Sequence, residues 1–354
     1  RQFVEFSTAA YAPLAYLPAA AAIAGGRVFD ATPLTLLYLA RWADILAASA
    51  LLAVAIRYGG YAAPGLCVVA LFPMSVSQIA IVSGDALTFA IAFLWIAVVM
   101  KAAVERPEWL RVRQIWLLPA IALAVSQLRP PFPLLGLLGL AIPLHPSDTS
   151  RRALLTASAV IAASILPAVA WNAHAVHLQT KPIIPEHVAP AEQLRYTIEN
   201  PGEFLEALQR DLARRGYEYW RQAVGRLGWM NIWLPEWIPA GFVCVLGCAL
   251  FFGAPGASQP RPAQRCLLGL ITMAGIVGVE LMIYLTFNGV GSRFIRGVQG
   301  RYFIPVVALL VFALSNQLFA WSRLRLPILA GCAAFTVAAH VGALIALSRA
   351  AAGE

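Results

Sequence analysis

Four arginines in this sequence have the type and spacing to bind a phosphate group. Arg293, Arg296 and Arg301 lie close together in the stretch Gly289–Pro305, between two long apolar runs, and Arg129 lies between two earlier apolar runs. The planar guanidinium group stays charged and makes paired hydrogen bonds to phosphate oxygens. If the apolar runs cross a membrane, these cations lie at the lipid–water boundary. The alternative is that they only anchor helix ends against lipid headgroups.

Two acidic residues are candidates to act beside these arginines. Asp85 follows Ser83-Gly84 at the start of an apolar run, where it can hold a sugar hydroxyl, a proton or a metal, or simply cap a helix. Glu280 lies inside the apolar run Cys266–Phe287 without a charged partner at helical spacing. A carboxylate within a membrane segment is a functional candidate by default. The alternative is a structural role, in which Glu280 is paired with Asn288 or with an arginine from another helix.

The composition predicts an integral membrane protein. The 354 residues are 60% hydrophobic and only 12% charged, with a mean hydropathy of +0.73, whereas soluble domains carry about 25% charge. The net charge of +9 is spread between apolar runs, so it indicates basic loops and anionic lipid rather than nucleic acid. Cysteines and histidines do not occur in a metal-binding pattern, and no metal site is predicted.

The apolar pattern predicts an all-α polytopic membrane protein with ten visible spans. Phe3–Phe29 contains Pro13 and Pro18 and is expected to lie at the interface rather than to span. The predicted regions are 1–32, a remnant of a first outer loop; 33–171, with six spans; 172–237, an external helical loop domain; and 238–354, with four spans. The ten predicted spans are Pro33–Ile56, Ala63–Val82, Ala86–Met100, Gln114–Leu128, Phe132–Leu144, Ala153–Trp171, Ile238–Gly253, Cys266–Phe287, Tyr302–Ala320 and Pro327–Leu347.

Lysine and arginine in the short loops predict the orientation. With Lys101–Arg113 in the cytoplasm, alternation places Arg57, Arg151, Arg261 and Arg323 on the same side, and segment 172–237 outside. The four candidate phosphate-binding arginines then lie outside, against the usual preference. An external anion would explain why cations occur there.

Three further features are predicted from local patterns. Asn200-Pro201-Gly202-Glu203 has the residues of a helix start, with asparagine as the cap. Trp229, with Trp233 and Trp237, indicates an interfacial aromatic belt, or else a stacking surface for a sugar or a lid over a lipid groove. Arg41 and Asp44 share a helix face and are expected to neutralise each other.

Seven short motifs occur in order along nearly the whole chain. They are Tyr11-Ala-Pro13-Leu-Ala-Tyr16-Leu-Pro18, Leu37-Tyr38-Leu-Ala-Arg41-Trp-Ala-Asp44, Pro73-Met74-Ser-Val-Ser77, Ser83-Gly-Asp85-Ala86, Arg129-Pro130-Pro131, Gly225-Arg-Leu-Gly228-Trp229 and Gln299-Gly300-Arg301-Tyr302-Phe-Ile-Pro305. Together they resemble a bacterial family of predicted polytopic membrane proteins of unknown function. That family looks related to the GT-C glycosyltransferases, which pass a sugar from a polyprenyl-phosphate carrier to an acceptor on the outer side.

The resemblance implies roles for several residues. Arg301-Tyr302 matches the arginine and tyrosine that face the carrier phosphate, and Arg129 matches a cation at an earlier outer turn. The catalytic acid of GT-C enzymes lies in the first outer loop, which is expected to precede Arg1; Glu5 is the one acidic residue left there, and Asp85 is the fallback.

The resemblance therefore implies a membrane glycosyltransferase in the bacterial inner membrane, with its active face outside. Arg301, Arg296 and Arg129 would hold the phosphate of a polyprenyl-phosphate-linked sugar, Tyr302 would add a hydrogen bond, and Asp85 would position the sugar. Arg293, Trp229 and Glu280 complete the candidate substrate-binding set. The expected partners are the lipid-linked sugar and membrane lipid, and a divalent cation is the one cofactor that the resemblance allows. A transporter or flippase, or a non-catalytic subunit for assembly of envelope polysaccharide, is the alternative.

Overall fold

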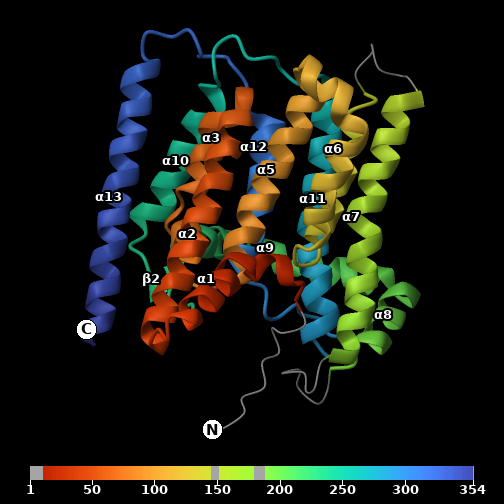
Figure 1. Ribbon diagram of the computed structural model, residues 1–354, viewed down its shortest axis with the longest axis vertical. Helices are drawn as coiled ribbons and strands as arrows, with labels where there is room; N and C mark the ends of the chain where they lie inside the picture. Colours follow the sequence, from red (N-terminus) through yellow and green to blue (C-terminus); the bar gives the residue numbers. More distant parts are fainter. Residues whose placement is uncertain (1–10, 145–150, 179–187, 354) are drawn as a thin grey trace.

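The computed structural model describes residues 11–144, 151–178 and 188–353, and 78% of it is helical. Five helices are long and apolar enough to cross a membrane, and they run roughly side by side (Figure 1). These helices are α2 (Pro33–Tyr58), α5 (Gly84–Val104), α7 (Arg151–Leu178), α11 (Pro262–Phe287) and α13 (Arg325–Ala352). Each contains one of the predicted spans.

The predicted span Ala63–Val82 is a bent pair of helices, which is either one broken span or a re-entrant loop. A short 3-10 turn, η3 (Gly60–Ala62), leads into α3 (Ala63–Ala70), and α4 (Pro73–Ile79) follows at a bend of 76°. Phe72, before the proline, has φ −60° and ψ 137°, which is not helical. Proline disfavours a helical conformation in the residue before it, and it lacks the N–H that would continue the helix. The hydroxyl of Ser75 donates to the carbonyl of Val69 at 2.9 Å, across the break.

The other four predicted spans are helices too short to cross a membrane unaided. They are the apolar part Ile115–Ser126 of α6 (Glu108–Ser126), the 3-10 helix η4 (Phe132–Ala141), α10 (Trp237–Phe251), and Gly300–Leu314, which comprises η6 (Gly300–Phe303) and α12 (Ile304–Leu314). At about 2 Å per residue, η4 reaches roughly 20 Å, less than the ~30 Å of a hydrocarbon core.

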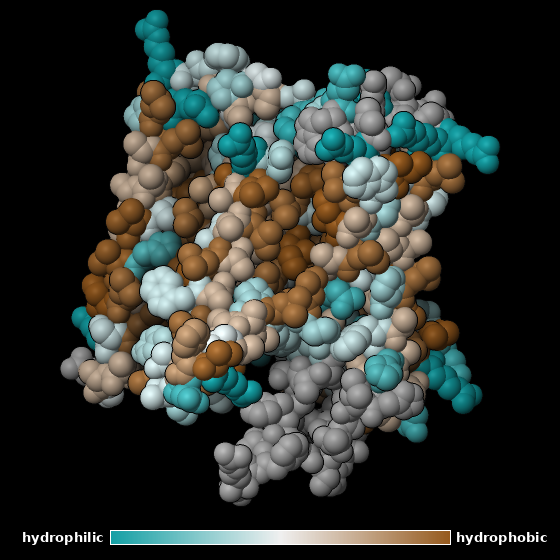
Figure 2. All heavy atoms as spheres, in the orientation of Figure 1, coloured by the Kyte–Doolittle hydropathy of each residue, from teal (hydrophilic) through white to brown (hydrophobic). Residues whose placement is uncertain are grey.

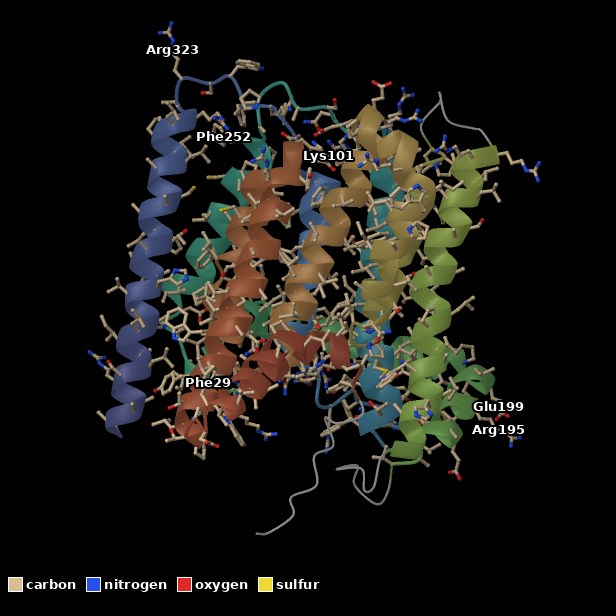
Figure 3. All side chains as sticks on the ribbon, in the orientation of Figure 1. Phe29, Lys101, Arg195, Glu199, Phe252 and Arg323 are labelled. Atoms are coloured by element: carbon tan, nitrogen blue, oxygen red, sulfur yellow. The ribbon has the colours of Figure 1, made fainter. Side chains whose placement is uncertain are left out.

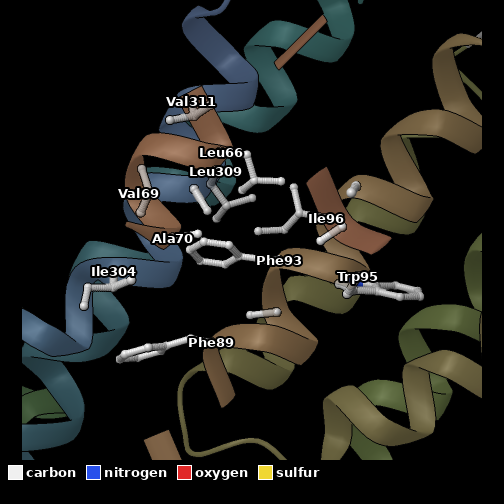
Figure 4. Packing of buried hydrophobic residues seen from close by; sticks show 14 of the residues in the cluster. Leu66, Val69, Ala70, Phe89, Phe93, Trp95, Ile96, Ile304, Leu309 and Val311 are labelled. Carbon is white, nitrogen blue, oxygen red and sulfur yellow. The ribbon is translucent and has the colours of Figure 1, made fainter. Parts of the chain in front are cut away.

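Helix α5 forms the centre of the bundle. The most apolar stretch of α5 is 83% buried, and Figure 4 shows Phe93 and Ile96 of α5 close to Leu66 of α3 and Leu309 of α12. The indole N–H of Trp95 donates to the carbonyl of Leu135 in η4 at 2.9 Å. This bond satisfies a polar group that would be costly to bury alone.

The N-terminal part described, η2 (Pro13–Tyr16) and α1 (Leu17–Val28), crosses one end of the bundle and packs on α2 (Figure 1). The 12 residues of α1 are too few to span. The expected pair of Arg41 and Asp44 is not among the ion pairs of the described residues, and the Arg41 guanidinium lies 5.9 Å from the centre of the Tyr38 ring. Asp44 is buried and accepts a hydrogen bond from the backbone of Ala19 instead.

At the same end lie α8 (Pro190–Glu199), α9 (Pro201–Gly225) and a hairpin of β1 (Arg226–Leu227) and β2 (Ile232–Trp233). The predicted start of α9 at Pro201 is confirmed, but the Asn200 side chain does not cap it. The Nδ2 of Asn200 donates to the carbonyl of Tyr196 at 3.2 Å. Phe204, Leu208 and Tyr219 of α9 pack against α11 and the loop after it.

Polar groups gather at the two ends of the bundle. An apolar band crosses the middle of the face in Figure 2, with hydrophilic residues toward both ends. Lys101 and Arg323 lie at one end, and Phe29, Arg195 and Glu199 at the other (Figure 3). The loops that the sequence assigned to opposite sides therefore lie at opposite ends.

Candidate functional site

Asp85 and Arg129 form the centre of the candidate site. Asp85 lies in the first turn of α5, where the Ser83 hydroxyl accepts from the Asp85 N–H at 3.3 Å. Because Ser83 caps the helix, the Asp85 carboxylate is available for other partners. Its Oδ1 lies 2.8 Å from Nη1 of Arg129, and the Asp85 side chain is only 5% exposed.

Arg301 approaches the same carboxylate from the other side. It lies in η6, and its Nε is 3.6 Å from Oδ2 of Asp85. Its Nη1 donates to Oε1 of Gln78 at 3.4 Å, and Gln78 is a buried residue of the bent helix α4. Segments far apart in the sequence therefore bring two guanidinium groups onto one carboxylate.

Three tyrosines surround this cluster. The Arg129 guanidinium lies 4.4 Å from the centre of the Tyr11 ring, and the Arg301 guanidinium lies 5.6 Å from the centre of the Tyr302 ring. The Tyr16 hydroxyl accepts a hydrogen bond from Arg129, and burial raises the pKa of Tyr16 although the arginine charge opposes this. Aromatic faces attract cations and exclude water, so the tyrosines hold the guanidinium groups in place.

A cavity of about 110 Å³ opens beside these groups. Its polar walls are Tyr11, Asp85, Arg129, Thr286 and Tyr302, and its apolar walls include Phe89 and Met282. Arg301 contacts Asp85 but is not among the described residues that line the cavity. Burial acts to lower the pKa of Arg129, but the Asp85 carboxylate raises it, and the net shift is upward. The guanidinium therefore stays charged. Two guanidinium groups and one carboxylate leave a surplus of one positive charge, which suits a single anion.

The cluster does not fit a divalent cation. Asp85 is the one carboxylate among the described residues lining the cavity, and both its oxygens face arginines. Hard cations prefer several oxygen ligands, and two guanidinium groups would repel the ion. Within the described ranges, no group of three or more His, Cys, Asp or Glu side chains could hold a metal.

The structure does not bring Arg296 or Arg293 into this cluster. The loop before η6 is held by Asn288, whose Oδ1 accepts from the Arg296 N–H at 2.9 Å and whose Nδ2 donates to the Arg296 carbonyl at 3.1 Å. The Arg296 side chain instead lines a second pocket, between this loop and α9. Arg293 is exposed and lies near Tyr196 of α8. The expectation that Arg296 shares a phosphate site with Arg301 and Arg129 therefore needs correction.

Glu280 lies on the side of α11 that faces α9. It is fully buried, and neither carboxylate oxygen has a hydrogen-bond partner among the described residues. Its charged neighbours are Asp211 and Arg215. Of the two alternatives for its partner, Asn288 is hydrogen-bonded to Ile283 and Arg296 instead, and Arg215 of α9 is the nearby arginine from another helix. Glu280 does not line the cavity beside Asp85.

Trp229 and Glu5 do not add to the cluster. Trp229 lies in the turn of the β1–β2 hairpin and is 97% exposed, and it lines neither of the two pockets described above. Glu5 lies outside the described residues.

Sequence reasoning did not assign a role to Gln78 or to the contacts of Tyr11 and Tyr16 with Arg129. The sequence places Tyr11 and Tyr16 within Phe3–Phe29, the segment expected to lie at the membrane interface, and indicates no more about them. Of these three residues, Gln78 is the one whose role the sequence could have indicated, because it is a lone amide within an apolar run. A buried amide needs a polar partner, and here that partner is Arg301.

Fold and composition together define a helical membrane protein with several apolar helices. More particularly, the chain belongs to the family described as predicted membrane protein (DUF2142), whose family model matches residues 1–310. This is a family of unknown function. The comparison with curated proteins found no match, and neither did the comparison with solved structures.

Proposed function

We propose that the protein is a membrane glycosyltransferase of the GT-C type. It would transfer a sugar from a polyprenyl-phosphate-linked donor to an envelope glycan, lipid or protein acceptor, on the outer face of the bacterial inner membrane. The observation that carries the proposal is the bridging of Arg129 and Arg301 by the buried carboxylate of Asp85, beside a cavity.

Charge balance supports a phosphate ligand at the Asp85–Arg129–Arg301 cluster, in which Asp85 and Arg129 line the cavity. A sugar linked through one phosphate to a lipid carries one negative charge, equal to the surplus of the Asp85–Arg129–Arg301 cluster. When the acceptor hydroxyl attacks the anomeric carbon, the bond from that carbon to the phosphate oxygen breaks, and the electron pair stays on the phosphate. The phosphate then gains a second negative charge, which two fixed guanidinium groups stabilise.

Asp85 suits a positioning role better than that of a base. Both its oxygens face guanidinium groups, so a proton taken there would weaken the two ion pairs that hold the arginines. The proton of the acceptor hydroxyl would pass to the acidic residue that the GT-C resemblance places in the first outer loop. Asp85 would keep Arg129 and Arg301 aligned on the phosphate and accept a hydrogen bond from the donor sugar.

One observation favours a transporter or flippase for a lipid-linked anion instead. The bent pair α3–α4 is a broken span or a re-entrant segment, and Gln78 in α4 contacts Arg301. Discontinuous helices at a binding site are typical of transporters. Such a protein would use the same arginines without chemistry.

A transfer assay separates the two functions. The full-length protein is reconstituted in liposomes with a panel of radiolabelled polyprenyl-phosphate sugars and crude envelope acceptor. Arg301→Ala is the test variant, and Arg323→Ala, an exposed arginine at the opposite end of the bundle, is the matched control. Label that moves to the acceptor, and that only Arg301→Ala abolishes, supports the transferase. Saturable, Arg301-dependent binding of the carrier without transfer supports the transporter.

A further inference from the structure

The pocket that contains Arg296 is a second, separate concentration of positive charge. It measures about 300 Å³ and lies between α9 and the loop that precedes η6. Four arginines line it, with one carboxylate: Arg210, Arg214, Arg215, Arg296 and Asp211. None of the four arginines lines the cavity beside Asp85.

Two of these arginines have structural partners. Arg215 donates from Nη1 to the carbonyl of Ile295 at 3.2 Å, and the same nitrogen lies 3.4 Å from Oδ1 of Asp211. Arg215 therefore ties α9 to the loop. Arg210 pairs with Glu206 at 2.6 Å.

Arg214 and Arg296 carry the surplus charge. Both are exposed, and among the described residues neither has an ion-pair partner. The Arg214 guanidinium lies 6.0 Å from the centre of the Phe294 ring, which orients it toward the pocket. Two guanidinium groups free to rotate onto one ligand can each make paired hydrogen bonds to the oxygens of a phosphate.

The rim of the pocket indicates an amphiphilic ligand. Phe294 is 49% exposed, and Val290 in the same loop is 43% exposed. The loop follows the apolar helix α11, whose end at Phe287 lies where lipid headgroups meet water if α11 spans. Cations at this depth meet the phosphates of the membrane lipids, and exposed apolar side chains beside them contact acyl chains.

We propose that this pocket is a binding site for the phosphate headgroup of an anionic membrane lipid. Arg214 and Arg296 contact the phosphate oxygens, and Phe294 contacts the adjoining glycerol and acyl carbons. Arg215 and Asp211 keep α9 and the loop at the spacing that the headgroup requires. This site does not depend on the glycosyltransferase proposal, because it shares no residue with the Asp85 cluster.

The test is binding of single lipids to the full chain in neutral detergent, followed by native mass spectrometry. Phosphatidylglycerol is the probe, phosphatidylcholine the neutral-headgroup comparison, and glycerol phosphate the soluble competitor. The double variant Arg214→Ala/Arg296→Ala should weaken phosphatidylglycerol binding at least tenfold. Both side chains are exposed, so the variant should fold, and an unchanged melting temperature verifies this.

Arg195→Ala is the matched control at the same end, since Arg195 is 82% exposed and lies on α8. It should leave binding unchanged. If the control and the double variant lost phosphatidylglycerol binding equally, the site would be overturned, because the lipid would then be attracted to the positive surface in general. Phosphatidylcholine bound as tightly as phosphatidylglycerol would overturn the selectivity for an anion. Glycerol phosphate that binds with the affinity of the lipid would overturn the lipid assignment and leave a soluble phosphate ester.

Discussion

Oδ1 of Asp85 and Nη1 of Arg129 lie 2.8 Å apart, with the aspartate side chain 5% exposed and the arginine side chain 20% exposed. The pair joins the start of α5 to the turn after α6, and Arg301 of η6 contacts the other carboxylate oxygen. One carboxylate thus holds three separate segments at the same end of the bundle.

Replacing Asp85 with asparagine should destabilise the protein. Asp85→Asn keeps the size of the side chain but leaves two partly buried guanidinium groups without a counter-charge, a loss on the order of 3 kcal/mol. The measurement is the free energy of unfolding, or the melting temperature, in detergent. Asp30→Asn is the control, because Asp30 is exposed and its φ of 48° is one that asparagine also adopts. Equal stability of both variants would show that the ion pairs contribute little.

Substituting Arg301 by lysine should weaken binding of a lipid-linked phosphate. Lysine keeps the charge but has no planar fork, so it cannot contact Asp85, Gln78 and a phosphate together. We expect the dissociation constant for a polyprenyl phosphate to rise by about tenfold, or about 1.4 kcal/mol. Arg323→Lys at the other end is the control. Unchanged affinity in Arg301→Lys would mean that only net charge matters there.

The sequence alone predicted the helical membrane character and the positions of most helices, because long apolar runs have few alternatives in lipid. It did not predict the bend at Phe72-Pro73, since proline is tolerated inside some membrane helices and the outcome depends on neighbours such as Ser75. It placed the four short apolar helices as spans, but an apolar run does not show that its helix is too short to cross a membrane unaided.

The candidate site was predictable in its residue types but not in its grouping. Arg129, Asp85 and Arg301 could each be chosen from the sequence by their charge beside apolar runs. Charge and position in the loop do not distinguish Arg296 from Arg301, which is only five positions later; the resemblance of Arg301-Tyr302 to a family motif is the one signal that separates them. The separation arises because Asn288 fixes the backbone at Arg296, while Gly300 lies against α9 and turns Arg301 toward Asp85.

Gly300 should not tolerate a side chain. A Cβ there would lie 2.1 Å from the Tyr219 carbonyl oxygen and 2.7 Å from the Ala223 nitrogen. The Gly300 N–H also donates to Oε1 of Gln222 at 2.8 Å. Gly300→Ala should therefore force α9 away from η6 and cost roughly 2–3 kcal/mol.

The checks for Gly300→Ala are thermal unfolding and limited trypsin cleavage within α9, which should become faster. Gly269→Ala is the matched control, because a Cβ there would meet no atom within 4 Å and alanine favours a helix. A Gly300→Ala protein as stable and as protease-resistant as the control would contradict the tight packing of α9 on η6.

High pH should loosen α9 through Tyr219. Burial, and then the hydrogen bond that the Tyr219 hydroxyl donates to Asp211, raise the pKa of Tyr219 above its ordinary value of 10.0. Because the folded state holds this proton more tightly, the stability it provides is fully present below pH ~10 and falls as the pH rises further. The melting temperature should decline less steeply above pH 10 in Tyr219→Phe than in the unaltered protein. Parallel declines would contradict this role for Tyr219.

The two ends of the bundle should lie on opposite sides of the membrane. Glu192 is exposed in α8 at one end, and Arg323 is exposed at the other, where the basic loops gather. With the five native cysteines replaced by alanine, a membrane-impermeant maleimide should label Glu192→Cys in intact spheroplasts. It should label Arg323→Cys only after permeabilisation, because basic loops stay in the cytoplasm. The reverse pattern would place the Asp85 cavity on the cytoplasmic side and contradict the proposal that the acceptor lies on the outer face. Labelling of both positions from outside would contradict a membrane-crossing bundle between them.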